Sequence, residues 1–184
     1  MRDHRDHPQQ AAVSPRARAP ERVEVPVASE LDVRRVVAAV MHLCSEHGLP
    51  QLLAAHVATA ASELANNLWM HTTQGGHMAV QLLRGHGLHG PSLGVEITSR
   101  DTGPGMADPQ RAMEEGFSTG GGLGCGLPGV QRLMDEFSLT STLGQGTVVV
   151  ARKWVQRPHS EQGTQGTRSA TGAPDARGAT GGTA

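Results

Sequence analysis

The stretch "FSTGGGLGCGLPG", residues 117–129, holds six glycines among its thirteen residues. Ordering a glycine costs more backbone entropy than ordering any other residue, so six glycines in one segment indicate a structural or functional requirement. Glycines let the backbone approach a ligand closely, and successive N–H groups can then point at a polyanion. The segment also enters a predicted helix with Pro128 near its first turn, where free amides favour phosphate. We therefore expect either a mobile lid over the phosphates of a nucleotide or a merely flexible loop.

Two common phosphate-binding motifs do not explain this stretch. Gly124, Gly126 and Gly129 match GxGxxG, but no strand ends just before them and no βαβ unit follows, so the dinucleotide fingerprint lacks its context. Lys153 is the only lysine, and it stands beside Trp154 at the end of a strand-like run. A phosphate-binding loop ending in GK[ST] and the lysine of eukaryote-type protein kinases are therefore both excluded.

Composition narrows the class of protein further. A chain of 184 residues suits one domain with tails. The net charge of -1 and an aromatic content of 2% give little support for nucleic-acid binding. The two cysteines form no CxxC pair, and the ten histidines show no recognised metal spacing. Because no signal peptide and no apolar run of roughly 18 residues occurs, we expect a cytoplasmic protein that does not bind membranes.

The chain divides into two tails and one compact unit. Residues 1–20 are polar and rich in proline and arginine, and residues 156–184 are rich in Gly, Thr, Ala and Ser, so both are expected to be disordered. Residues 21–155 form the unit. It begins with "RVEVPVA" (22–28), whose alternating valines predict a half-buried strand and whose Pro26 predicts an edge position.

Two helices are expected next. The first begins after Ser29, which caps it with Asp32 three residues on, and it ends at Gly48. The second follows Pro50 and ends in "TTQGG" at 72–76. The apolar spacing turns these residues inward: Val33, Val36, Val37, Val40, Met41 and Cys44 in the first helix, and Leu53, Val57, Leu64 and Leu68 in the second.

Four strands and a short helix complete the unit. We expect strands at 77–84 and 93–99, joined by a turn at 85–92 that is rich in glycine and histidine. Strands at 137–142 and 147–154 flank a turn at 143–146. The order β-α-α-β-β-α-β-β predicts an α+β fold with a largely antiparallel sheet and helices on one face. In the short helix and just after it, these residues have the spacing to face the sheet: Val130, Leu133, Met134 and Phe137.

In the second helix, "SELANN" places Glu63 and Asn67 four residues apart at the edge of the buried face. Both side chains project from one side of the helix, with Cβ atoms roughly 5–6 Å apart. An amide oxygen suits Mg²⁺, and a carboxylate can accept a proton from a nucleophile. The alternative for this pair alone is an ordinary solvated glutamate and asparagine.

Asp101 stands in "RDTGPGM", where a strand ends and Gly103, Pro104 and Gly105 force a turn. A carboxylate there can accept a hydrogen bond from an exocyclic amino group such as that of adenine, whereas guanine would present a carbonyl. Hydrogen bonds to charged groups are worth ~1.5–3 kcal/mol, which is enough to select the base. The alternative is a tight turn with a solvated aspartate.

The order of these segments is similar to that of a known family. "ELANN", "DTGPG", "GGGLGCGL" and "GQGT" follow one another as do the boxes of the GHKL (histidine kinase-like) ATPase superfamily. Over residues 21–154 the chain most resembles its anti-sigma regulatory kinases of the RsbT-type, the switch-protein serine/threonine kinases, in "TAASELANN", "GFSTGGGLGCGLPGVQRLMDEF" and "GQGT" followed by "KW". The resemblance implies the Bergerat ATP-binding fold, a two-layer α/β sandwich with a mixed, mostly antiparallel sheet and about three helices on one face.

The resemblance also implies a role for each matching residue. Glu63 would be the general base, Asn67 the Mg²⁺ ligand, and Asp101 the group that recognises adenine. Thr147 would help to hold the base through water. The remaining nucleotide-binding positions would be Gly103 and Gly105 in the wall beside the base, Thr119, Gly120, Gly121, Gly122, Leu123, Gly124 and Gly126 in the lid, and Leu127 in the helix behind it.

On this resemblance we expect an ATP- and Mg²⁺-dependent protein kinase that phosphorylates a serine or threonine of a STAS-domain anti-sigma-factor antagonist. A binding module stays open as the alternative. It would use ATP as a conformational latch and would sequester a sigma factor or activate a PP2C-type phosphatase without phosphotransfer. A severed histidine-kinase catalytic domain fits less well, because no helical segment with a phosphoacceptor histidine precedes the unit.

Overall fold

A computed structural model describes residues 21–87, 90–114 and 126–156 of the chain. The predicted tails therefore lie almost wholly outside the described residues, and the division into two arms and one unit stays a prediction. The elements follow the expected order, with one short 3₁₀ helix added. They are β1 (Arg22–Val27), α1 (Glu30–Glu46), α2 (Gln51–His71), β2 (Gly76–Gly87), β3 (Gly90–Asp101), η1 (Arg111–Met113), α3 (Gly126–Leu133), β4 (Glu136–Thr142) and β5 (Gly146–Trp154).

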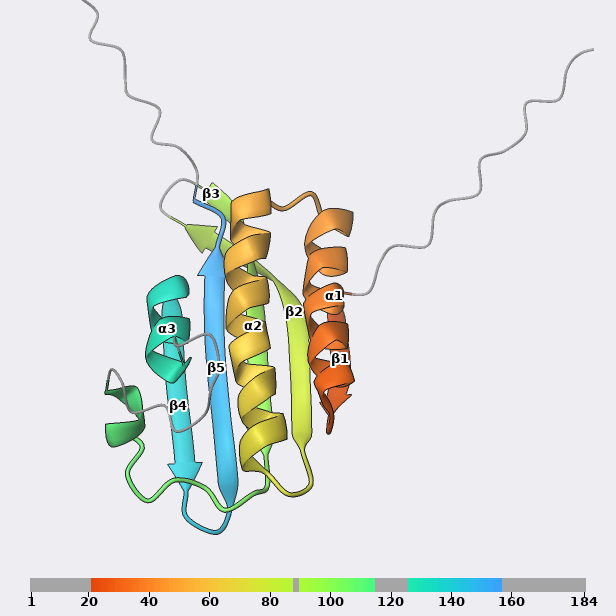
Figure 1. Cartoon of the computed structure of the whole chain (residues 1–184). Helices are drawn as coiled ribbons and strands as arrows, with labels where there is room; N and C mark the ends of the chain where they lie inside the picture. Colours follow the sequence, from red (N-terminus) through yellow and green to blue (C-terminus); the bar gives the residue numbers. More distant parts are fainter. Residues whose placement is uncertain (1–20, 88–89, 115–125, 157–184) are drawn as a thin grey trace, which may run out of the picture.

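The five strands form one sheet in the order β1-β2-β3-β5-β4, and every neighbouring pair of these strands is antiparallel. The helices α1, α2 and α3 lie together on one face of this sheet (Figure 1). The predicted α+β architecture with two layers is thereby confirmed. Pro26 lies in β1 at the edge of the sheet, where a residue without an N–H is tolerated. In the part of the chain that the structure describes, no helix is long and apolar enough to cross a membrane.

The predicted turn at 85–92 is wrong, because β2 and β3 extend through most of it. Their register continues to the pair of Gly87 and Gly90. A Cβ added at Gly85 would lie 3.0 Å from the ring of Trp154, and one at Gly94 would lie 2.6 Å from it. The glycines at these two positions therefore make room for the indole of Trp154 on the strands, whereas the sequence pattern placed Gly85 in a turn.

The core lies between the helices and the sheet. Val33, Val36 and Val40 of α1 are buried there as predicted. Met41, predicted to be inward, is 42% exposed, and Leu43 is buried in its stead. The buried stripe follows the spacing 33, 36, 40, 43, so position 41 falls on the outer side of the helix. Full burial of a valine or leucine contributes about 1.5–3 kcal/mol, so this stripe holds α1 on the sheet.

Ser29 is the N-cap residue of α1 as predicted, but its side chain makes no capping hydrogen bond to the backbone and binds the side chain of Asp32 instead. The Ser29 hydroxyl donates to Asp32 Oδ2 at 2.7 Å, and the backbone N–H of Ala28 donates to the same oxygen at 3.2 Å. These bonds, the Ser29 bond foremost, lower the pKa of Asp32 from its ordinary value. The carboxylate of Asp32 therefore ties the end of β1 to the first turn of α1.

Helix α3 is as short as predicted. Val130 and Met134 are buried, while Leu133 is half-buried. Phe137, expected in line with them, belongs to β4 and packs against the core from the sheet. Side chains of α3 and of β4 therefore pack into the same hydrophobic core.

Candidate functional site

Helix α2 places Glu63 and Asn67 at the edge of the core. The residues predicted to hold the helix on the sheet are all buried: Leu53, Val57, Leu64 and Leu68. Glu63 is only 8% exposed, and Asn67, one turn later, is half-buried. Glutamate is almost never this buried unless it has a partner or a function. The pair is therefore not the solvated surface pair that the sequence left open.

Asp101 is the last residue of β3, where the strand was expected to end. Its Oδ1 accepts a hydrogen bond from the backbone N–H of Gly103 at 2.8 Å, which closes a local turn. A Cβ at Gly103 would lie 3.0 Å from that oxygen and 3.3 Å from Thr72 Cγ2. Because Thr72 directly follows α2, the Asp101 turn packs against the end of the helix that carries Glu63 and Asn67.

The β4–β5 turn closes against the Asp101 turn through backbone atoms. A Cβ at Gly105 would lie 2.1 Å from the carbonyl oxygen of Thr142, and one at Gly146 would lie 2.2 Å from that of Asp101. The N–H of Gly144 donates to the carbonyl of Pro104 at 2.7 Å. Gly105 and Gly146 also have φ values of +65° and +102°, a region that favours glycine. Gly105 and Gly146 are thus required by the close contact between the two turns.

Thr147 follows Gly146 and lies opposite Ser141 in the β4–β5 register. Their hydroxyl oxygens are 2.9 Å apart, and the N–H of Met106 donates to Ser141 Oγ at 2.8 Å. Sequence reasoning found Thr147 and missed Ser141. The expected strands at 137–142 and 147–154 begin and end so that Thr147 would lie opposite Thr142. In the observed register β5 is shifted by one residue, so Thr147 lies opposite Ser141.

The other candidate residues divide into two groups. Gly126, with φ of +49°, begins α3, and Leu127 is buried at 7% exposure where α3 packs on α2. The structure thus brings α3 into contact with the helix that carries Glu63. The rest of the predicted lid lies outside the described residues: Thr119, Gly120, Gly121, Gly122, Leu123 and Gly124.

The described donors fit a magnesium ion held jointly with a nucleotide. Mg²⁺ keeps several waters and takes one or two protein oxygens together with substrate phosphates. The Asn67 amide oxygen, one turn from the Glu63 carboxylate, supplies such a donor. Among residues 21–87, 90–114 and 126–156, no group of three or more His, Cys, Asp or Glu residues could hold a metal by itself.

Known proteins and a protein family match parts of the chain. A family described as the histidine kinase-like ATPase domain matches residues 25–153, well over half of the chain. The serine/threonine-protein kinase RsbT of Bacillus subtilis (strain 168) is 43% identical over 115 residues, which cover 62% of this chain and 83% of RsbT. The solved RsbU and RsbW domains of a Mycobacterium tuberculosis protein are 17% identical, with a TM-score of 0.49. That match covers 72% of this chain, which spans only 32% of the solved chain.

Proposed function

Because the chain belongs to the histidine kinase-like ATPase family and is a serine/threonine-protein kinase of the RsbT type, we propose that it uses Mg·ATP to phosphorylate a STAS-domain antagonist. The observation that carries this proposal is the buried Glu63, one turn before Asn67 on a helix whose end packs against the Asp101 turn. A proton acceptor, a magnesium ligand and a base-reading carboxylate thereby come from elements in direct contact.

In this proposal Glu63 accepts the proton of the target hydroxyl as the γ-phosphoryl group leaves ATP. Its carboxylate is positioned for this role at the edge of the core, one turn before Asn67. Asn67 offers its amide oxygen to Mg²⁺, which neutralises phosphate charge when bound. The protein otherwise acts by positioning and charge stabilisation.

Asp101 selects the base in this proposal. The bond from Gly103 engages Oδ1, so Oδ2 can accept from the amino group of adenine. Gly103 and Gly105 form the wall beside it, and Thr147 holds the base from β5. The role of the lid at 119–126 rests on the resemblance of its glycines to the family pattern, and main-chain amides there would contact the phosphates.

The test is transfer of labelled phosphate from γ-labelled ATP to a STAS-domain partner that contains a serine or threonine. Glu63→Gln should lower the transfer rate by about 10²–10⁴-fold, the usual contribution of a general base, and leave ATP binding intact. Glu46→Gln, at the exposed end of α1, is the matched control and should transfer normally. Normal transfer by the Glu63 variant would show that the assigned base is wrong.

The same assay separates transfer from a binding role. A chain that only used ATP as a latch would bind it and label nothing. We propose the STAS-domain antagonist as substrate, and a PP2C-type phosphatase or a sigma factor as the further partner to be sought by pull-down in Mg·ATP. The cytoplasmic location stays a prediction.

A further inference from the structure

One hydroxyl lies between the two turns that meet beside Asp101. Ser141 Oγ lies 2.9 Å from Thr147 Oγ1 and 3.2 Å from the carbonyl oxygen of Gly146, and it accepts the N–H of Met106 at 2.8 Å. Met106 belongs to the segment after Asp101, whereas Gly146 and Thr147 begin β5. A single side chain therefore connects the Asp101 turn, the β4–β5 turn and Thr147.

The proton of Ser141 can go to only one of these partners. A serine hydroxyl has one proton to donate and two lone pairs that accept. The N–H of Met106 occupies one lone pair. For all three contacts to be hydrogen bonds, Ser141 must donate to the carbonyl of Gly146 and accept the proton of Thr147. Thr147 Oγ1 then presents only lone pairs to any other group near it.

We infer that Ser141 is a positioning residue for base selection, which fixes the Thr147 hydroxyl as an acceptor. This inference rests on the proposed function, because it requires a purine at Asp101. The amino group of adenine is a donor, and it matches an acceptor pair made of Asp101 and Thr147. The carbonyl of guanine meets two acceptors there and is rejected.

Removing the Ser141 hydroxyl releases the proton of Thr147. The threonine hydroxyl can then rotate and donate to a guanine carbonyl as readily as it accepts from an adenine amino group. Ser141→Ala should therefore change which base is bound, a result that a purely structural bond would not produce. Ser141→Thr keeps a hydroxyl at the same position and should restore the preference.

The experiment is calorimetry of the full chain with Mg²⁺ and either ATP or GTP. Ser141→Ala should lower the ratio of ATP affinity to GTP affinity about tenfold, the equivalent of one oriented hydrogen bond of about 1.4 kcal/mol. Ser138→Ala, on the exposed side of the same strand, is the control and should leave the ratio unchanged. In a background of Thr147→Val, adding Ser141→Ala should have no further effect on the ratio, because Ser141 acts through Thr147.

The outcomes separate the two proposals. A wild-type chain that binds neither nucleotide, or that shows no preference for adenine, overturns the proposed function and this inference with it. A selective wild type whose Ser141→Ala variant keeps the full ratio, with or without a lower melting temperature, overturns the inference alone. If Ser141→Ala does not fold, the Thr147→Val variant is the test. An unchanged ratio of ATP affinity to GTP affinity in that variant also contradicts the inference.

Discussion

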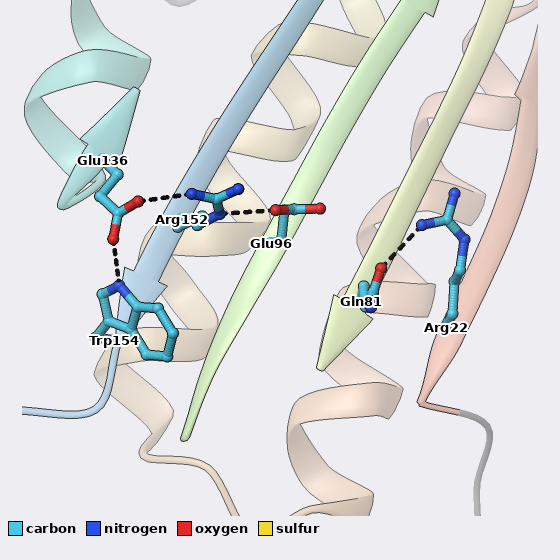
Figure 2. A network of polar contacts seen from close by, with 6 residues as sticks. All are labelled: Arg22, Gln81, Glu96, Glu136, Arg152 and Trp154. Carbon is cyan, nitrogen blue, oxygen red and sulfur yellow. Dashed lines mark hydrogen bonds and ion pairs between the residues drawn. The ribbon is translucent and has the colours of Figure 1, made fainter. Parts of the chain in front are cut away.

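The end of the sheet at Asp101 is held together differently from the face of the sheet opposite α1, α2 and α3, which we term the open face. At the Asp101 end, main chain packs against main chain, and Gly105 and Gly146 leave no space for a Cβ. On the open face, polar side chains meet across the strands with the helices behind them (Figure 2). In the first region two glycines are fixed by backbone contacts, and the second is made of side-chain contacts that are mostly exposed. The residues proposed to read the base lie in the first region.

The open face carries one row of side chains from all five strands, which we term the polar ladder: Arg22, Gln81, Glu96, Arg152 and Glu136. Arg22 donates to Gln81 at 2.9 Å, and Arg152 donates to Glu96 at 2.7 Å and to Glu136 at 2.8 Å (Figure 2). Exposed ion pairs are worth about 0–1 kcal/mol each. Substitutions in the ladder should therefore have small, graded effects.

The largest effect is expected from Gly105→Ala. Its Cβ would lie 2.1 Å from the carbonyl oxygen of Thr142, at a φ of +65°. Strain and overpacking together should lower the free energy of unfolding by about 3 kcal/mol or more, as measured by urea unfolding. Gly144→Ala is the matched control, because it has a φ of +75° and nothing within 4 Å. It should cost about 1 kcal/mol. Equal losses in the two variants would show that the contact with the Thr142 carbonyl adds nothing to the cost of a side chain at positive φ.

A smaller loss is expected from Trp154→Ala on the open face. The ring of Trp154 lies against Gly85 and Gly94, and its Nε1 donates to Glu136 at 2.7 Å. Because the side chain is half-buried, its removal should cost about 2–3 kcal/mol, below the range for a buried tryptophan. Trp154→Phe keeps most of the packing and should cost about 1 kcal/mol, the contribution of one hydrogen bond. If the phenylalanine variant is as unstable as the alanine variant, packing on the glycines is not the main contribution.

The helices and strands were largely predictable because their patterns are local. Valines on alternate positions of β1 and apolar residues on one side of α2 specify each element by itself, and both predictions are confirmed. The full length of the β2–β3 hairpin was not predictable in the same way. Gly85 looks like a turn residue until Trp154, about seventy positions further on, occupies the space above it and above Gly94.

The candidate site shows the same division. Helical spacing placed Glu63 and Asn67 together, and the end of a strand placed Asp101, so these three could be named from sequence. Ser141 could not, because its contacts depend on the exact pairing of β4 with β5 and on a turn from another part of the chain. Contacts between segments that are distant in the sequence depend on how the whole chain packs, and a local sequence pattern does not predict them.

The smallest effect concerns the charge of Glu136 in the polar ladder. The hydrogen bond from Trp154, followed by that from Arg152, lowers the pKa of Glu136 from its ordinary value of 4.5. Its contribution to stability is therefore complete above pH 4.5 and is lost as the pH falls through the lower pKa of the folded state. The difference in urea midpoint between wild type and Glu136→Gln should be constant from neutral pH to 4.5 and shrink below it. Because Asp32 also has a lowered pKa, Asp32→Asn is needed as a second variant to divide the acid loss between the two carboxylates. A difference that does not change with pH would mean that Trp154 and Arg152 bind the neutral side chain equally well, so the ladder would be held by shape rather than by charge.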